Sequence, residues 1–199
     1  MAIPVEHDER RKIILEKALA VFLDDGFEGA TFQKIADRCG ITRTILYLYF
    51  KNKREIFSYS IKQLLLTVEE NINVIRTDAS LSSTDKLTRV LLTVFKLLEQ
   101  NRQLLSILLD YLLHVIKNDV NPETRIRRRT VKLRHMLSSM VIEGVKAGEF
   151  KKVNIKTTND YLYSFIESAI FQLVILKRSD FNELKEAAAF AVRQLAVKS

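Results

Sequence analysis

The side chains best suited to chemistry lie close together in one segment, TRTILYLYFKNK, which runs from Thr42 to Lys53. An arginine reads a guanine edge with two hydrogen bonds, and a threonine methyl or an isoleucine contacts a thymine methyl. Tyrosine hydroxyls and lysine ammonium groups suit phosphate oxygens, which position a protein on a duplex. Together these residue types favour a nucleic-acid surface over a catalytic centre.

Catalysis would need a different set of residues. The chain has three histidines and one cysteine without metal-ligand spacing, and it has no nucleotide-binding loop and no nucleophile elbow. We therefore expect no catalytic residue, no metal and no cofactor. Cys39 is interpreted as a small apolar residue beside a turn, and a thiol sensor is the alternative.

Two short helices separated by a sharp turn would position the segment. The first helix carries four apolar residues at the spacing of one helix face: Phe32, Ile35, Ala36 and Cys39. Thr31 is placed to cap this helix through its hydroxyl. Gly40 follows the helix and suits the positive φ at which many helices end.

The second helix would follow its cap, Thr42, with Ile45, Leu46 and Phe50 turned inward. The pattern is typical of a helix-turn-helix, whose second helix lies in the DNA major groove. Its outward side and the neighbouring positions supply the candidate DNA-binding residues: Thr31, Gln33, Lys34, Thr42, Arg43, Thr44, Tyr47, Leu48, Tyr49, Lys51 and Lys53. A three-helix packing unit with a solvated basic edge is the alternative.

A further helix is expected before this motif. Pro4 predicts a frayed arm over residues 1–8, so the helix would run from about residue 10 to residue 25 and end at Gly26. Arg11, near its start, is interpreted either as a phosphate contact or as part of a solvated helix end.

A long helix is expected after the motif. Asn52 and Glu55 form a capping box that would open a helix over about residues 54–75. A polar loop over 77–84 follows, and Ser82 with Asp85 indicates a second capping box. The long helix would carry movements of the following domain to the DNA-binding part.

Residues 11–57 resemble the DNA-binding region of the TetR family of transcriptional regulators. The matching residues are small, apolar, aromatic and basic side chains in register: Ile14, Ala18, Phe22, Gly26, Phe27, Thr31, Ile35, Ala36, Gly40, Ile41, Leu46, Tyr47, Tyr49, Phe50, Lys53 and Ile56. The chain departs from the family where glycine and then threonine often precede Leu46, because it has Thr44 and Ile45 there. That departure changes the groups that would face the bases.

Composition predicts an all-α fold. The 199 residues include five glycines and two prolines, and long apolar-periodic segments dominate the chain. No uncharged apolar run reaches the roughly 18 residues of a membrane span, and the N-terminus lacks the apolar core of a signal peptide, so we expect a cytoplasmic protein that does not enter a membrane. The predicted architecture is an N-terminal three-helix helix-turn-helix domain, residues 8–53, joined by a long helix to a C-terminal helical ligand-binding and dimerisation bundle within residues 54–199.

The net charge of +8 is distributed unevenly. Residues 1–60 carry ten Lys/Arg and nine Asp/Glu, whereas residues 121–160 carry ten against four. A helix expected over 122–147 holds a basic face formed by Arg125, Arg128, Arg129 and Lys132. This face is interpreted as solvated, with an acidic ligand's entrance or a secondary nucleic-acid contact as the alternatives.

A small-molecule pocket is expected in the second domain. Helices over about 86–100 and 104–116 are apolar on more than one side, which places them centrally, and effector pockets are mostly apolar with a few polar groups. The candidate lining residues are Phe95, Tyr111, His114, Met136 and Met140. Ordinary core packing is the alternative for each of them.

The last two helices, over about 155–177 and 181–197, show more apolar surface than one subunit should expose. The resemblance implies that they pair with the same helices of a second subunit, so a homodimer is expected. The candidate interface residues are Tyr161, Phe165, Ile166, Ala169, Leu173, Ala188, Ala191, Val192 and Leu195.

The resemblance implies a dimeric bacterial repressor. It would bind a near-palindromic double-stranded operator and be released by a small-molecule effector, although the sequence leaves activation open. Two other classes remain as alternatives: an enzyme, and a helical module whose basic face binds a membrane or an acidic partner.

Overall fold

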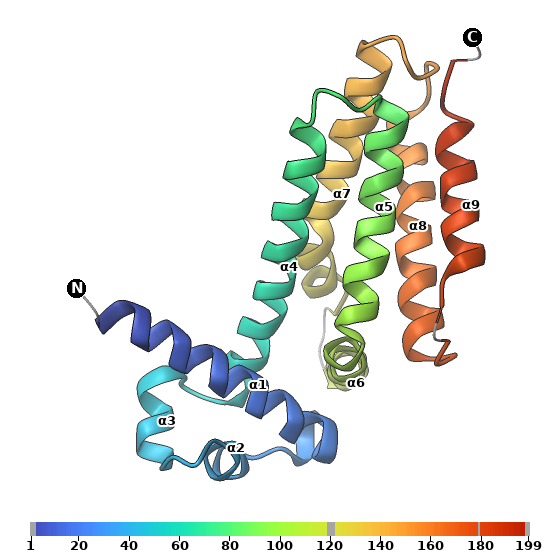
Figure 1. The fold of residues 1–199 in the computed structure, drawn as a ribbon. Coiled ribbons are helices and arrows are strands. Elements are labelled where there is room, and N and C mark those ends of the chain that lie inside the picture. Colours follow the sequence, from blue (N-terminus) through green and yellow to red (C-terminus); the bar gives the residue numbers. More distant parts are fainter. Residues whose placement is uncertain (1–2, 119–121, 179, 198–199) are drawn as a thin grey trace. The chain divides into compact units, whose positions relative to one another are not determined.

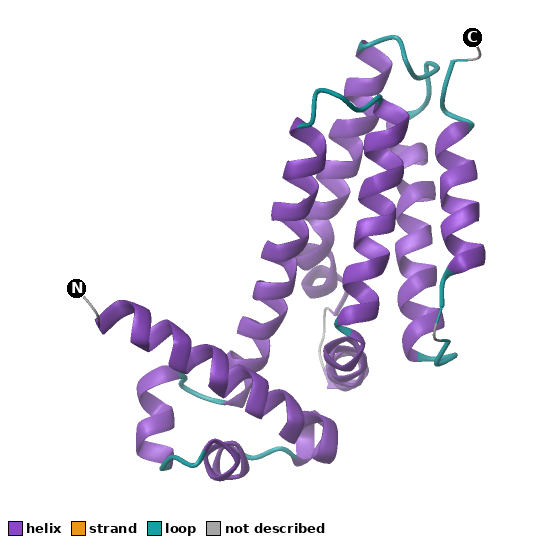
Figure 2. Ribbon diagram, viewed as in Figure 1, coloured by secondary structure: helices purple, strands orange, loops and turns teal. Residues whose placement is uncertain are grey.

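The computed structural model describes residues 3–118, 122–178 and 180–197, except for the side chains of 3–6, 113–118 and 122–130. This part of the chain is helical and has no strand (Figure 2); its one β-type pairing is an isolated bridge between Phe150 and Ala196. The helices are α1 (Ile3–Gly29), α2 (Phe32–Cys39), α3 (Arg43–Tyr49), α4 (Lys53–Thr77), α5 (Ser83–Gln100), α6 (Arg102–Asn118), α7 (Pro122–Lys146), α8 (Ile155–Val174) and α9 (Asn182–Arg193) (Figure 1). The all-α prediction is confirmed.

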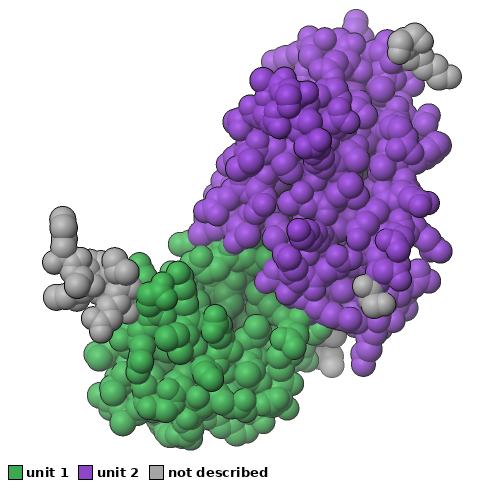
Figure 3. All heavy atoms as spheres, viewed as in Figure 1, with its two compact units in different colours: residues 1–65, 103–118 green, residues 66–102, 119–199 purple. Residues whose placement is uncertain are grey.

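The chain forms two compact units (Figure 3). Unit 1 comprises residues 1–65 and 103–118, and unit 2 comprises residues 66–102 and 119–199. By packing, α6 therefore belongs with the helix-turn-helix and not with the helices that follow it. The functional division into residues 8–53 and 54–199 stays a prediction.

Unit 1 has an apolar core shared by all of its helices. The largest contributions come from buried aromatic and branched side chains: Ile14, Phe22, Phe27, Ile35, Leu46, Phe50, Ile56, Phe57, Leu104, Ile107 and Tyr111. The ring centroid of Tyr111 lies 4.7 Å from that of Phe27 and 5.2 Å from that of Phe57. Burial of this aromatic cluster holds α6 against α1 and α4.

Unit 2 is a helix bundle in which α5, α7, α8 and α9 run alongside one another (Figure 1). Each helix turns one apolar face inward, as its sequence pattern predicts. The buried residues include Leu87, Val90, Leu91, Val94 and Phe95 on α5, Leu137 and Val141 on α7, Leu162 and Ile166 on α8, and Ala188 and Val192 on α9.

The start of α1 differs from the prediction. The helix begins at Ile3 and includes Pro4, so the expectation of a frayed arm up to Asp8 is wrong for residues 3–8. Proline is tolerated in the first turn because the backbone N–H that it lacks has no partner within the helix there. The predicted end is confirmed, since Gly26 leaves helical geometry at a φ of 70°.

Most other helix ends agree with the predicted caps. Thr31, Thr42 and Ser82 each accept a hydrogen bond from the backbone N–H three residues ahead. Pro122 opens α7 as predicted. In the described part of the chain, no helix combines the length and the apolarity that crossing a bilayer requires.

Candidate nucleic-acid interface

The turn between α2 and α3 is closed by backbone hydrogen bonds. Gly40, at a φ of 67°, donates its N–H to the carbonyl of Asp37 at 3.0 Å, and Ile41 donates to the carbonyl of Ala36 at 3.1 Å. Thr42 then caps α3, accepting from the N–H of Ile45 at 3.2 Å. The free backbone groups at the end of α2 and at the start of α3 thus find partners within this short connection. The direction of α3 relative to α2 is therefore determined by local contacts.

The inner side of the motif is fully buried. Ile35, Ala36, Leu46 and Phe50 are at most 1% exposed. Ile45, which the sequence placed among the inner anchors, is 40% exposed, so that expectation is wrong. Leu46 and Phe50 stand four residues apart on one helix face, whereas Ile45 is rotated about 100° away from Leu46.

The outer side of α3 is open to solvent. Thr42, Arg43 and Thr44 are exposed, Tyr47 is 50% exposed and Leu48 is 72% exposed. Arg43 donates from Nη2 to the hydroxyl of Tyr47 at 3.2 Å. Arg43, Thr44, Tyr47 and Leu48 share one face of α3, which is the arrangement that contact with base edges requires, and Thr42 caps the start of the helix.

The candidates on α2 are exposed, and they pair with acidic groups. Lys34 Nζ lies 3.1 Å from a carboxylate oxygen of Asp25, and Gln33 donates its side-chain amide to Asp37 at 2.7 Å. Thr31 is exposed and serves as the cap of α2. Exposed ion pairs of this kind contribute little to stability, so a phosphate could replace the carboxylate partner of Lys34.

Tyr49, another candidate, is half-buried. Its ring stacks on that of His7 with centroids 4.7 Å apart, and its carbonyl accepts a hydrogen bond from Arg11 Nη2 at 3.3 Å. The guanidinium carbon of Arg11 lies 5.0 Å from the centroid of Phe50 and 4.7 Å from that of Tyr59. Arg11 is thus neither a solvated helix end nor an outward phosphate contact, because it joins α1, α3 and α4.

Lys53 is also placed differently from the other candidates. Its ammonium group donates to the carbonyls of Phe27, Glu28 and Ala30 at 2.7, 2.9 and 2.9 Å, which occupies all three N–H donors. A cation at these carbonyls stabilises the end of α1. The predicted phosphate contact of Lys53 would require it to give up one of these bonds. Lys51 is exposed.

The start of α4 contains the predicted capping pair. Asn52 accepts from the N–H of Glu55 at 2.9 Å, and the carboxylate of Glu55 accepts from the N–H of Lys51. The box therefore reaches one residue farther back than the usual pattern.

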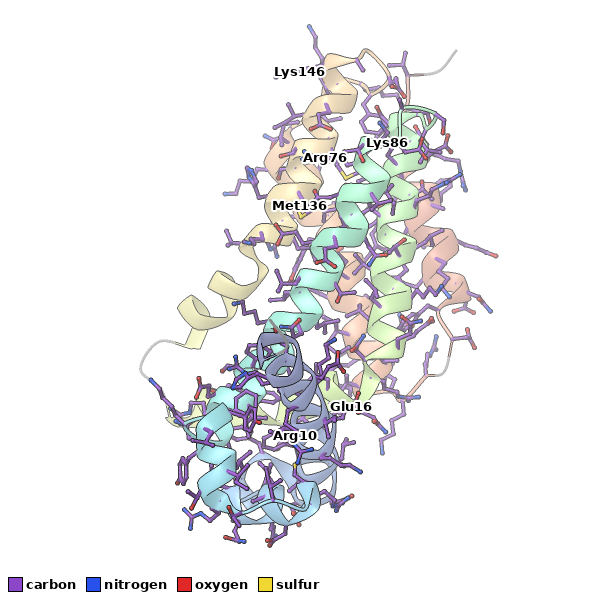
Figure 4. All side chains as sticks on the ribbon, turned by 60° about the vertical axis from the view of Figure 1, so that its left-hand side comes forward. Arg10, Glu16, Arg76, Lys86, Met136 and Lys146 are labelled. Atoms are coloured by element: carbon purple, nitrogen blue, oxygen red, sulfur yellow. The ribbon has the colours of Figure 1, made fainter. Side chains whose placement is uncertain are left out.

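The candidate effector residues lie in different parts of the protein. Phe95 is buried in unit 2 against Phe181, with ring centroids 6.0 Å apart. Met140 is buried and Met136 is half-buried, about midway along α7 (Figure 4). Tyr111 instead belongs to the core of unit 1.

Two predicted features fall outside the described side chains. His114 lies on α6, but its side chain is among those not described, as are Arg125, Arg128 and Arg129 of the basic face. Lys132, the remaining member of that face, is described, and its Nζ lies 3.2 Å from a carboxylate oxygen of Glu69.

The candidate dimer residues are mostly internal. Those that pack inside unit 2 with at most 9% exposure are Ile166, Ala169, Leu173, Ala188, Ala191, Val192 and Leu195. Phe165 is half-buried and Tyr161 is 51% exposed. Other apolar side chains are exposed on α8, just after it and on α9: Phe171, Ile175, Leu176 and Phe190, at 49–57%. Most of the predicted interface residues are therefore buried within the chain, and the dimer interface itself stays a prediction.

Cys39 is half-buried in unit 1. Burial raises the pKa of its thiol, although the positive charges of Lys17 and Arg10 oppose the shift. A thiol held in the protonated form is a poor nucleophile, which favours the apolar interpretation over a sensor.

Comparisons with known proteins agree with this geometry. A sequence model of one family, described as bacterial regulatory proteins of the tetR family, matches residues 14–59. The fatty acid metabolism regulator protein of Bacillus subtilis is 24% identical over 162 residues, 79% of this chain and 79% of that protein.

Solved structures extend the likeness to the whole fold. A TetR transcription regulator from Haloarcula marismortui superposes with a TM-score of 0.80 at 18% identity, covering 96% of this chain and 100% of the other. The FadR regulator of Bacillus subtilis, solved in complex with stearoyl-CoA, superposes with a TM-score of 0.69 at 21% identity, covering 93% and 97%.

Proposed function

This chain belongs to the TetR family of DNA-binding transcriptional regulators, and from that premise we propose that it is a dimeric repressor released from its operator by a small-molecule effector. Its relatives are regulators and not enzymes. The observation that carries the proposal is the division of α3 into a buried side, with Leu46 at 0% exposure, and an open side bearing Arg43, Thr44, Tyr47 and Leu48. An α-helix presented in this way fits the major groove.

Phosphate contacts would come from exposed groups around α3. Lys51 is exposed two residues after the end of α3. Lys34 on α2 forms a solvent-exposed ion pair with Asp25, which a phosphate could replace. Between residues 40 and 54 the chain has four basic residues and no acidic one. This local positive charge supports DNA binding better than the net charge of the whole chain does.

Dimerisation is proposed through the exposed apolar side chains of α8 and α9 and the residues that directly follow α8. Phe171 and Phe190 are both more than half exposed, as are Tyr161 and Leu176. Apolar side chains gathered on neighbouring helices mark association surfaces, and a two-fold axis uses each contact twice. Two recognition helices about one DNA turn apart would then contact a near-palindromic operator.

The effector proposed for the first test is a long-chain acyl thioester of coenzyme A. The name of the Bacillus subtilis relative and the stearoyl-CoA in the FadR structure suggest this class. Two features of this chain support it: the helices of unit 2 are rich in large apolar side chains, and residues 121–160 hold a strong excess of basic residues for an anionic group.

The protein would be released from its operator because the effector binds one conformer of the protein more tightly than the other. An effector shifts an equilibrium only by its difference in affinity for the two states. Two helices connect the units through the chain itself and could transmit such a shift. Helix α4 contains residues of both units. Helix α6 packs in unit 1, whereas the residues before and after it belong to unit 2.

Selection of bound duplexes from a random pool tests the function. We expect a recovered sequence with two related half-sites, and light scattering at micromolar protein should give the mass of two chains. Stearoyl-CoA should then reduce operator binding in a gel-shift titration, with free coenzyme A as the control. Recovery of no sequence would refute the DNA-binding proposal, and a monomer bound to a single half-site would refute the dimer.

A further inference from the structure

The outer face of α3 offers two exposed apolar side chains to the bases, beside the polar groups of Arg43, Thr44 and Tyr47. Leu48 is 72% exposed and Ile45 is 40% exposed, while the opposite side of the helix is buried in the core. We infer that Leu48, together with Ile45, recognises the C5-methyl groups of thymines in the operator, so that sequence preference depends on these methyls. This inference rests on the proposed DNA-binding function and identifies which bases the site reads.

Several polar groups around α3 have hydrogen-bond or ion-pair partners within the chain. Gln33 donates its amide to Asp37, Lys53 donates to three backbone carbonyls, and Lys34 is paired with Asp25. Arg43 already donates to the hydroxyl of Tyr47. Leu48 and Ile45 have no polar group to offer, so their contribution must come from apolar contacts, and thymine is the base that offers a methyl in the major groove.

The spacing of the two apolar side chains suits neighbouring bases. Ile45 and Leu48 are three residues apart, so they adjoin on the helix surface about 4.5 Å apart along its axis. Successive bases on one strand are separated by about 3.4 Å, so the pair can contact consecutive or closely spaced thymines.

Charge distinguishes DNA from a second copy of the chain as the occupant of this face. Basic residues flank the apolar pair, and residues 40–54 contain no acidic side chain. Two copies meeting through this face would bring like charges together, whereas the DNA backbone neutralises them.

Deoxyuridine provides the test, because it is thymidine without the methyl group. The operator recovered by selection is resynthesised with deoxyuridine at each thymine of one half-site in turn and titrated with the full-length protein. Burial of one methyl-sized group changes affinity by about fourfold, so at least one position should show a loss of that size. Thymines outside the half-sites serve as the DNA control.

A double-mutant cycle, which combines a substitution in the protein with deoxyuridine in the DNA, assigns the contact to Leu48. Leu48→Ala should bind the thymine operator about tenfold more weakly and lose little more on the deoxyuridine operator. Val74→Ala is the matched control, since Val74 on α4 is also 72% exposed, and its affinity should equal that of the unmodified protein.

Three outcomes would overturn the inference. Equal affinity for both operators would show that no methyl is read, while the proposed DNA binding would stand. Equal deoxyuridine losses in the unmodified protein and in Leu48→Ala would place the methyl contacts on other residues. Failure to select any operator would overturn the inference and the proposed function together.

Discussion

The ammonium nitrogen of Lys53 lies 2.7 Å from the carbonyl oxygen of Phe27, at the point where α1 ends. Two further carbonyls accept from the same group, so the start of α4 is joined to the end of α1 by one side chain. This contact makes Lys53 a structural residue of the DNA-free chain, whereas its sequence pattern predicts a phosphate contact.

Replacement of Lys53 should therefore lower stability. Charged hydrogen bonds contribute about 1.5–3 kcal/mol, so we expect Lys53→Met to lower the free energy of unfolding by about 2 kcal/mol in urea titrations. Lys51→Met is the control, because an exposed lysine changes stability by less than about 0.5 kcal/mol while its loss reduces the salt dependence of operator binding by about one unit of slope. Unchanged stability of Lys53→Met would refute the structural role.

Arg11 should matter for stability through its contacts with two adjoining aromatic rings. Arg11→Met retains the apolar stem but removes the hydrogen bond to Tyr49 and the stacking on Phe50 and Tyr59. Because partly desolvated cation–π contacts contribute about 1–2 kcal/mol, thermal unfolding should show a comparable loss. Arg10→Met, at an exposed position on the same helix (Figure 4), should have no such effect.

Gly144 in α7 should not tolerate alanine, although alanine normally favours a helix by about 1 kcal/mol. A Cβ there would lie 2.3 Å from Cδ2 of Phe150, so the ring would have to move. We expect Gly144→Ala to destabilise the protein by about 1–3 kcal/mol, as overpacking does. Gly29→Ala, whose Cβ would meet its nearest atom at 3.5 Å, is the control. A second substitution, Phe150→Leu, should recover part of the loss, and purely additive effects would contradict the steric explanation.

The proposed dimer interface can be tested by introducing a charged side chain into it. Phe190→Asp places a carboxylate in the apolar surface of α9 and should convert the dimer to monomer in sedimentation experiments at micromolar concentration, because an interface desolvates that charge without a partner. Val74→Asp, at an apolar position on α4 that is 72% exposed, should leave the mass unchanged. Dimers of normal affinity in Phe190→Asp would place the interface elsewhere.

Cys39 should react slowly with thiolate-directed reagents. Burial raises the pKa of the Cys39 thiol, so less thiolate is present at pH 8 than in a free cysteine. We therefore expect iodoacetamide to react more slowly with native Cys39 than with the thiol of glutathione. The rate for Cys39 should keep rising with pH above the pKa of an ordinary thiol. In urea the two rates should converge, and fast modification of the native protein would contradict the assignment.

Sequence determined the elements whose signals are local. Thr31, Thr42 and Ser82 cap helices because each hydroxyl accepts from an N–H three residues ahead, and Gly40 ends α2 because positive φ suits glycine. Helical spacing identifies Leu46 and Phe50 as inner residues. The same spacing misplaces Ile45, because it does not define the edge of the buried face in so short a helix.

The tertiary structure alone decided the contacts between distant segments. Lys53 meets its carbonyl partners across 23 to 26 residues, Arg11 meets Tyr49 across 38, and Phe27 donates its N–H to the carboxylate of Asp110 across 83. Similarly, the pattern of α8 and α9 revealed apolar helices but not which apolar side would be covered within the chain. Periodicity describes which residues share a helix face, whereas the partner of that face depends on how the whole chain packs.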